Sequence, residues 1–138
     1  MHISLVGCRE STVDFFPELG KALAKKISGV EVGERFVPFP DDLPVVALEC
    51  AKESDFVFVF ALLEDEAKAM FITEKLIDVE LSSGTRILKA VLADDFSAED
   101  EDDYIEKKNA LVEEYSALIL GVLFGESSFR PKGKDFSL

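Results

Sequence analysis

Carboxylates are the most abundant side chains in this sequence that could do chemistry. The chain has 28 Asp and Glu among 138 residues, and residues 94–106, DDFSAEDEDDYIE, hold eight of them in thirteen positions. Such a run could hold a divalent cation through carboxylate oxygens, so no cofactor is firmly predicted and Mg²⁺ stays open. We favour a helix start instead, because Ser97 and Asp100 have capping-box spacing and acids stabilise a helix N-terminus.

Other catalytic groups are few. His2, the one histidine, begins the first predicted strand, at the sheet end opposite the expected site, so acid–base chemistry by histidine is not predicted. Cys8 follows that strand, as the nucleophile of small tyrosine phosphatases does, but the arginine needed six positions later is Asp14. Cys8 and Cys50 form no zinc-binding spacing, so both are predicted to be buried thiols in a reducing compartment. No glycine-rich phosphate loop is present.

The overall charge excludes several partners. A formal net charge of −13 opposes binding to nucleic acids and to anionic membrane surfaces. The N-terminus has no signal-peptide pattern and the apolar runs are too short for a membrane span, so we expect a soluble, cytoplasmic protein. The chain has no glutamine and a single asparagine, which suggests the hypothesis of a thermophilic source.

Apolar spacing predicts strands alternating with helices along the whole chain. Strands are expected over 2–7, 30–37, 54–62 and 87–93, and helices over 14–28, from a cap at Asp41 or Asp42 to 53, over 64–81, and after the acidic run. This order predicts an α/β three-layer sandwich with a four-stranded parallel sheet of order 2-1-3-4. We expect one domain, 1–138, with an irregular tail from about 125.

In such a sheet, ligands bind beyond the carboxyl ends of the strands. The loops 8–12, 38–42, 63–68 and 94–98 are therefore the candidate functional segments. The helix over 64–81 adds a possible interface, because it carries two apolar stripes. One runs through Ala67, Met70, Phe71 and Ile77, and the other through Ala69, Ile72, Leu76 and Val79. We expect the second stripe, with Ile72 and Leu76, to face another chain.

A family resemblance rests on the second of these loops. Val37 and Pro38 are followed, after four residues, by Leu43, Pro44 and Val45. This pattern resembles the lumazine synthase fold, and most closely the archaeal-type riboflavin synthases, whose Val-Pro-Gly turn leads into a Leu-Pro-Val helix start. Further matches are Val13 with Asp14, a third strand initiated at Asp55, and Gly133-Lys134 after a helix ending in Leu123 and Phe124.

The resemblance implies a homopentamer whose sites lie between neighbouring subunits and bind lumazine or flavin. It implies a transferase of riboflavin biosynthesis that moves a four-carbon unit between two molecules of 6,7-dimethyl-8-ribityllumazine, giving riboflavin. The turn 38–42 would hold the ring, and carboxylates or hydroxyls the ribityl chain. The candidate substrate-binding residues are Glu10, Thr12, Asp14, Phe39, Asp41, Glu64 and Lys68.

The chain departs from the family pattern at three places. Glu10 stands where the family has an aromatic residue, Phe39 replaces the turn glycine, and Met70 and Phe71 occupy the positions of a His-Glu pair. Two main interpretations therefore stay open. One is a diverged riboflavin synthase, and the other is a paralogue that lost the chemistry and serves as a binding or structural module. An unrelated flavodoxin-like protein is the third.

Overall fold

The computed structural model describes residues 1–11 and 13–125, so Thr12, Gly133, Lys134 and nearly all of the expected tail lie outside the described residues. Four strands alternate with helices, as the apolar spacing predicts. The elements are β1 (His2–Cys8), α1 (Phe16–Lys26), β2 (Glu31–Val37), a 3₁₀ turn η1 (Pro40–Asp42), α2 (Leu43–Glu53), β3 (Phe56–Leu63), α3 (Glu66–Ser83), β4 (Arg86–Ala93) and α4 (Glu101–Phe124).

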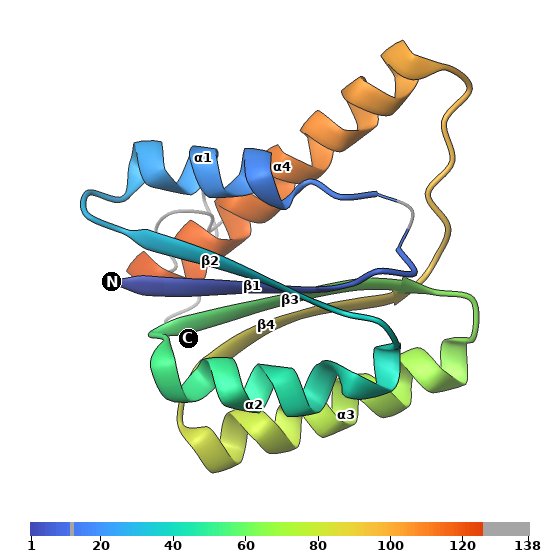
Figure 1. Ribbon diagram of the computed structural model, residues 1–138. Helices are drawn as coiled ribbons and strands as arrows, with labels where there is room; N and C mark the ends of the chain where they lie inside the picture. Colours follow the sequence, from blue (N-terminus) through green and yellow to red (C-terminus); the bar gives the residue numbers. More distant parts are fainter. Residues whose placement is uncertain (12, 126–138) are drawn as a thin grey trace, which may run out of the picture.

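The sheet is parallel throughout, with strand order β2-β1-β3-β4. Figure 1 shows α1 and α4 on one face of the sheet and α2 and α3 on the other. The described residues therefore form the three-layer, flavodoxin-like α/β sandwich that the sequence predicts. The strand order reverses between β1 and β3, because β2 lies on one side of β1 and β3 on the other.

Burial of β3 on both faces explains its unbroken apolar sequence, FVFVFALL. Phe56, Phe58 and Phe60 join the core under α1 and α4, whereas Val57 and Val59 join the core under α2 and α3. Successive side chains of a strand point to opposite faces, so a central parallel strand needs apolar residues at every position.

An aromatic cluster fixes α1 and α4 to their face of the sheet. Phe15, at the start of α1, lies edge-on to Phe60 with ring centroids 4.8 Å apart, and Tyr115 of α4 lies 5.1 Å from Phe58. These rings belong to one buried cluster, in which Phe15 and Phe58 are fully inaccessible. Aromatic pairs of this geometry stabilise a core beyond their buried area.

Two helix starts differ from the sequence prediction. Asp42 occupies the cap position of α2 but makes no capping hydrogen bond through its side chain, because η1 already turns the chain there. The start of α4 is capped by Asp100 rather than Ser97, since Asp100 Oδ1 accepts from the Asp103 amide at 2.8 Å. Asp103 Oδ2 in turn accepts from the Glu99 amide, the residue before the cap, so the arrangement is close to a capping box but uses a different backbone donor.

The prediction for the two stripes of α3 was wrong. Ile72 and Leu76 are 1% and 0% exposed and pack in the core of their own chain, whereas Met70 and Ile77 are 60% and 40% exposed. Glu74 explains the reversal, because it interrupts the stripe of Met70 and Ile77 and a carboxylate resists burial. Periodicity shows that the helix has two apolar faces. A charged residue within one of them indicates that this face is exposed to water.

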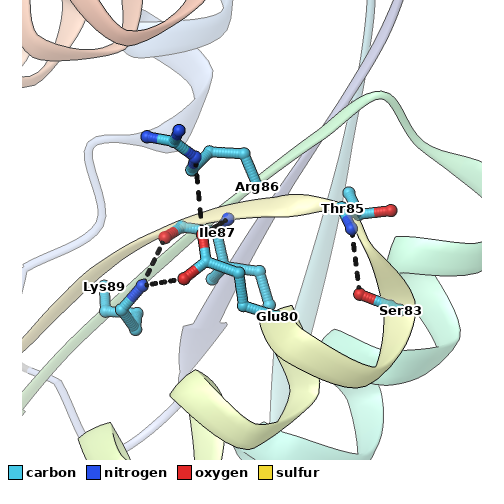
Figure 2. Close-up of polar contacts among 6 residues, drawn as sticks. All are labelled: Glu80, Ser83, Thr85, Arg86, Ile87 and Lys89. Atoms are coloured by element: carbon cyan, nitrogen blue, oxygen red, sulfur yellow. Dashed lines mark hydrogen bonds and ion pairs between the residues drawn. The ribbon is translucent and has the colours of Figure 1, made fainter.

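Side chains close part of the exposed edge of β4, as Figure 2 shows. Glu80 accepts a hydrogen bond from the Ile87 amide at 2.8 Å and from Lys89 Nζ at 2.7 Å. Lys89 Nζ also donates to the Ile87 carbonyl at 2.8 Å, and Arg86 Nε lies 3.7 Å from Glu80. We call Glu80, Ile87 and Lys89 the Glu80 clamp. It satisfies both backbone groups of Ile87 on the side away from β3.

Substitutions on α3 test which of its two apolar faces is buried. Ile72→Glu should cost several kcal/mol of unfolding free energy, on the order of 4 or more, because it buries an unpaired charge. Ile77→Glu should change that free energy by about 1 kcal/mol or less, since Ile77 is partly in water. Urea unfolding followed by circular dichroism measures both, and equal losses would contradict the assignment of the faces.

The Glu80 clamp should make stability depend on pH in the acid range. Burial alone would raise the pKa of Glu80, but hydrogen bonds from Lys89 and the Ile87 amide, with the charges of Lys89 and Arg86, lower it below its ordinary value. The clamp therefore contributes fully above the unfolded-state pKa of about 4.3, and its contribution is lost as pH falls through the lower folded-state pKa.

We expect Glu80→Ala to cost roughly 1.5–3 kcal/mol at neutral pH, the usual value of a hydrogen bond to a charged group. The difference between the two proteins should shrink as pH falls below about 4 in denaturant titrations. A difference that stays constant down to pH 2 would show that the carboxylate charge is not what stabilises this edge. Glu53→Ala, an exposed residue at the end of α2, is the control.

Candidate functional site

The loops after β1, β3 and β4 meet at the carboxyl edge of the sheet, on the right of Figure 1. Strand order reverses between β1 and β3, so their loops diverge over opposite faces of the sheet. A crevice at this switch point is where ligands bind in open α/β sheets. Glu10 follows β1 and Glu64 follows β3, which places one carboxylate on each side of it.

A hollow of about 390 Å³ lies at this edge, and we call it the rim hollow. Its lining consists of short apolar side chains and four carboxylates, from Glu10, Leu62, Leu63, Glu64, Ala93, Asp94 and Asp95. All four acidic residues are exposed to water. The rim hollow thus offers an apolar surface with hydrogen-bond acceptors around it.

Hydrogen bonds hold the β1 loop against the ends of β2 and β3. The Arg9 amide donates to the Val37 carbonyl at 2.9 Å, which extends the pairing of β1 with β2 by one residue. Ser11 Oγ accepts from the Leu62 amide at 3.2 Å, and the Ser11 amide donates to the Cys8 carbonyl. Glu10 is therefore carried on a turn fixed at both ends.

The start of α3 positions a second part of the site. Asp65 caps the helix by accepting from the amides of Ala67 and Lys68. One turn into the helix, Lys68 Nζ lies 3.2 Å from Asp41 Oδ1, so α3 is linked to the turn between β2 and α2. The two side chains are 41% and 69% exposed, so water screens this pair strongly.

Phe39 stands on the same turn, and its side chain is exposed. It is 60% accessible, whereas Pro40, the next residue, is buried and anchors η1. An exposed phenyl ring next to buried backbone provides an unoccupied aromatic face. It is the one feature of this turn suited to contact a planar ring.

Asp14 lies apart from the rim hollow, because its carboxylate is used to start α1. Its Oδ1 accepts from the Phe16 amide at 3.1 Å. Asp14 also contributes, after burial, to raising the pKa of Glu34 on the neighbouring strand, together with Glu18. Thr12, the remaining candidate of this loop, lies outside the described residues.

Cys8 ends β1 close to all three loops but is closed off from them. It is 3% exposed. Burial raises the pKa of the Cys8 thiol above its ordinary value; the Glu10 backbone and the Lys68 charge oppose the rise only in part, and the Glu10 and Asp42 carboxylates add to it. A thiol that stays protonated is a poor nucleophile, so Cys8 is a packing residue here.

The structure therefore brings together only part of the predicted set. Glu10 and Glu64 share the rim hollow, whereas Asp41, Lys68 and Phe39 do not line it: Asp41 and Lys68 form an ion pair, and Phe39 is exposed on the turn that carries Asp41. Sequence reasoning missed Asp94, Asp95 and Ser11 as site residues. All three lie in segments that the sequence marked as candidate loops, 8–12 and 94–98, but the acidic run as a whole was interpreted as a helix start, so no single residue of it was chosen.

The four carboxylates limit the kinds of ligand that the rim hollow can bind. Ionised carboxylates only accept hydrogen bonds, so they suit ligands rich in hydroxyl or amino groups and repel phosphate. Within residues 1–11 and 13–125, no three or more His, Cys, Asp or Glu side chains converge as a metal site. His2 lies at the other end of β1, so proton transfer at this rim falls to Glu10, Glu64 or the two aspartates.

Comparison with known proteins adds no assignment. No family model matches the chain, and no curated protein matches it significantly. Among the described helices, none combines the length and the apolar character that crossing a bilayer requires.

The anchoring of the β1 loop can be tested by one substitution. Ser11→Ala should cost roughly 1–3 kcal/mol of unfolding free energy, because the partly buried Leu62 amide loses its acceptor. Hydrogen exchange at the Leu62 amide should accelerate as well. Lys68→Ala is the control and should cost less than about 1 kcal/mol, since it removes an exposed ion pair. Unchanged exchange at Leu62 in Ser11→Ala would contradict the anchoring role.

Proposed function

We propose that this chain binds 6,7-dimethyl-8-ribityllumazine at the rim hollow and acts as a riboflavin synthase, in which one molecule transfers a four-carbon unit to a second, giving riboflavin and leaving the donor as 5-amino-6-ribitylaminouracil. The observation that carries the proposal is the lining of the rim hollow. Apolar side chains and acceptor-only carboxylates surround a space of about 390 Å³ at the switch point of the sheet. A flat ring bearing a neutral polyhydroxyl chain has the matching chemistry.

The carboxylates favour a ribityl chain over a phosphorylated one. Each ribityl hydroxyl can donate a hydrogen bond to Glu10, Glu64 or Asp94, and hydrogen bonds to ionised acceptors are the stronger kind. A phosphate at the same place would meet four negative side chains without a cation among the residues that line the hollow. The proposed ligand is thus a lumazine or riboflavin rather than a flavin nucleotide.

The size of the rim hollow supports an oligomer. About 390 Å³ lies near the lower end of the range for small-molecule sites, so it suits one ligand and not two. A reaction between two lumazines then needs a second wall from another copy of the chain. The exposed residues Met70, Ile77 and Leu81 of α3 supply apolar surface for such a contact. The family resemblance implies a homopentamer.

Proximity would provide most of the rate enhancement. Holding two identical heterocycles in reacting geometry can gain on the order of 7 kcal/mol through orientation and lost entropy. The exposed carboxylates of Glu10 and Glu64 are the side chains of this rim able to accept and return protons. Phe39 would stack against the ring from the turn between β2 and α2.

One observation favours a second candidate function, a lumazine- or flavin-binding module without catalysis. Met70 and Phe71 are 60% and 55% exposed, at the positions where the resembling enzymes carry a His-Glu pair. Neither side chain can transfer a proton. A chain that kept the pocket and lost this pair would bind the ligand and leave it unchanged.

The two functions separate in one experiment. Purified protein incubated with the lumazine should develop riboflavin fluorescence with time if the chain is a synthase. Phe39→Ala should weaken ligand binding about fivefold, the effect of losing one aromatic contact of roughly 1 kcal/mol. Phe124→Ala is the matched control, because Phe124 is an exposed aromatic residue at the far end of α4.

Each other outcome has a definite meaning. Saturable binding of riboflavin without product formation would establish the binding module in place of the enzyme. No binding of either compound would refute both functions. A protein that sediments as a monomer with ligand bound would contradict the arrangement with two ligands between neighbouring copies.

A further inference from the structure

The outer edge of β4 is closed along only half of its length. The Glu80 clamp satisfies the amide and carbonyl of Ile87, which shows that these groups point away from β3. Backbone groups of a strand repeat their direction at every second residue, so those of Lys89, Val91 and Ala93 point outward too. No backbone partner for these three residues on that side is present among residues 1–11 and 13–125.

A groove runs beside this open half. It has a volume of about 510 Å³ and lies between the end of β4, at Val91 and Ala93, and the first half of α3. The helix contributes the exposed side chain of Met70 and the carboxylates of Glu66 and Glu74. An open strand edge beside an apolar, acidic groove can accept an extended segment of opposite charge.

The sequence contains one segment with that pattern, in residues 126–138. Arg130, Lys132 and Lys134 alternate with Pro131 and Gly133 in a chain whose net charge is −13. In an extended conformation every second side chain points the same way, so the three cations form one row. Pro131 has no amide hydrogen, which suits a strand position that faces away from its neighbour.

The handedness of the fold disfavours parallel docking of this segment on β4 of its own copy. α1 lies on the face that α4 shares and carries the chain from β1 to β2, away from β4. Since parallel crossovers are right-handed in about 98% of cases, a helix on that face moves the chain in that direction. A segment that left α4 and added parallel to the outer edge of β4 would form the rare left-handed crossover.

We propose that residues 126–138 of a second copy of this chain add as an extra strand to the open half of β4. Arg130, Lys132 and Lys134 face Glu66 and Glu74 across the groove, and their backbone groups pair with Lys89, Val91 and Ala93. Pairing β4 with β4 of another copy instead would bring acidic grooves together, which like charges oppose. The inference does not rest on the proposed function, because it is argued from the strand edge and the groove alone, although the groove adjoins the rim hollow at Ala93.

Hydrogen exchange on the full chain tests this docking. At high protein concentration the amides of Lys89, Val91 and Ala93 should be protected, and dilution should speed their exchange by about tenfold or more. The triple change Arg130→Glu, Lys132→Glu and Lys134→Glu should abolish the protection at every concentration. The Ile87 amide, held by Glu80 of its own chain, is the internal control and should keep its protection.

Two further variants make the test specific. Lys25→Glu, Lys26→Glu and Lys52→Glu change the net charge equally on exposed helix ends and should leave β4 protected. A second protein with Glu66→Lys and Glu74→Lys keeps its own tail. When it is mixed with the tail-reversed protein, protection should return on β4 of the tail-reversed copy.

Three results would overturn the proposal. They are unprotected β4 amides in the unchanged protein at high concentration, protection that survives the tail reversal, and protection that does not vary with concentration. The last result would mean that each chain covers its own edge. None of these readouts requires lumazine, so the docking and the binding of lumazine at the rim hollow can fail separately.

Discussion

Burial of β3 on both faces is the constraint on which the rest of the structure depends. Its phenylalanines pack under α1 and α4, and its valines pack under α2 and α3, so β3 carries no polar side chain. The neighbouring β1 is buried almost as completely. Function is thereby displaced to the loops, and the loops of β1 and β3 diverge over opposite faces because the strand order reverses between them. The rim hollow follows from this arrangement and not from any single motif.

The fold could be predicted because its signals are local and repeated, whereas several site details depend on contacts between distant residues. Alternation of strand and helix fixed the order and parallel direction of β1 to β4. The capping of α4 by Asp100 could not be separated from capping by Ser97, since acids crowd the whole segment. Asp94 and Asp95 entered the site only when the end of β4 was seen beside the loop of β3. The Ser11 contact with Leu62 spans 51 residues and has no sequence signature.

The charge distribution separates the two ends of the sheet. Carboxylates gather at the carboxyl edge around the rim hollow, whose lining includes no Lys or Arg, and the nearby Lys68 is paired with Asp41. At the other end Glu80 is neutralised by Lys89 and Arg86 and serves to close a strand edge. Acidic side chains thus stabilise structure where they are paired and remain available to a ligand where they are not. Asp and Glu side chains therefore have two different physical roles in this protein.

The open half of β4 and the rim hollow are adjacent, because Ala93 lines both the groove and the hollow. A strand from a second copy, laid along β4, would therefore end beside the rim hollow. Under the proposed function the rim hollow would hold one lumazine, and the chain that closes the edge would supply the wall beside it. Assembly and substrate binding would then both depend on the carboxyl end of β4. An unpaired strand edge, usually a liability, becomes in this arrangement the feature that positions one subunit at the site of the next.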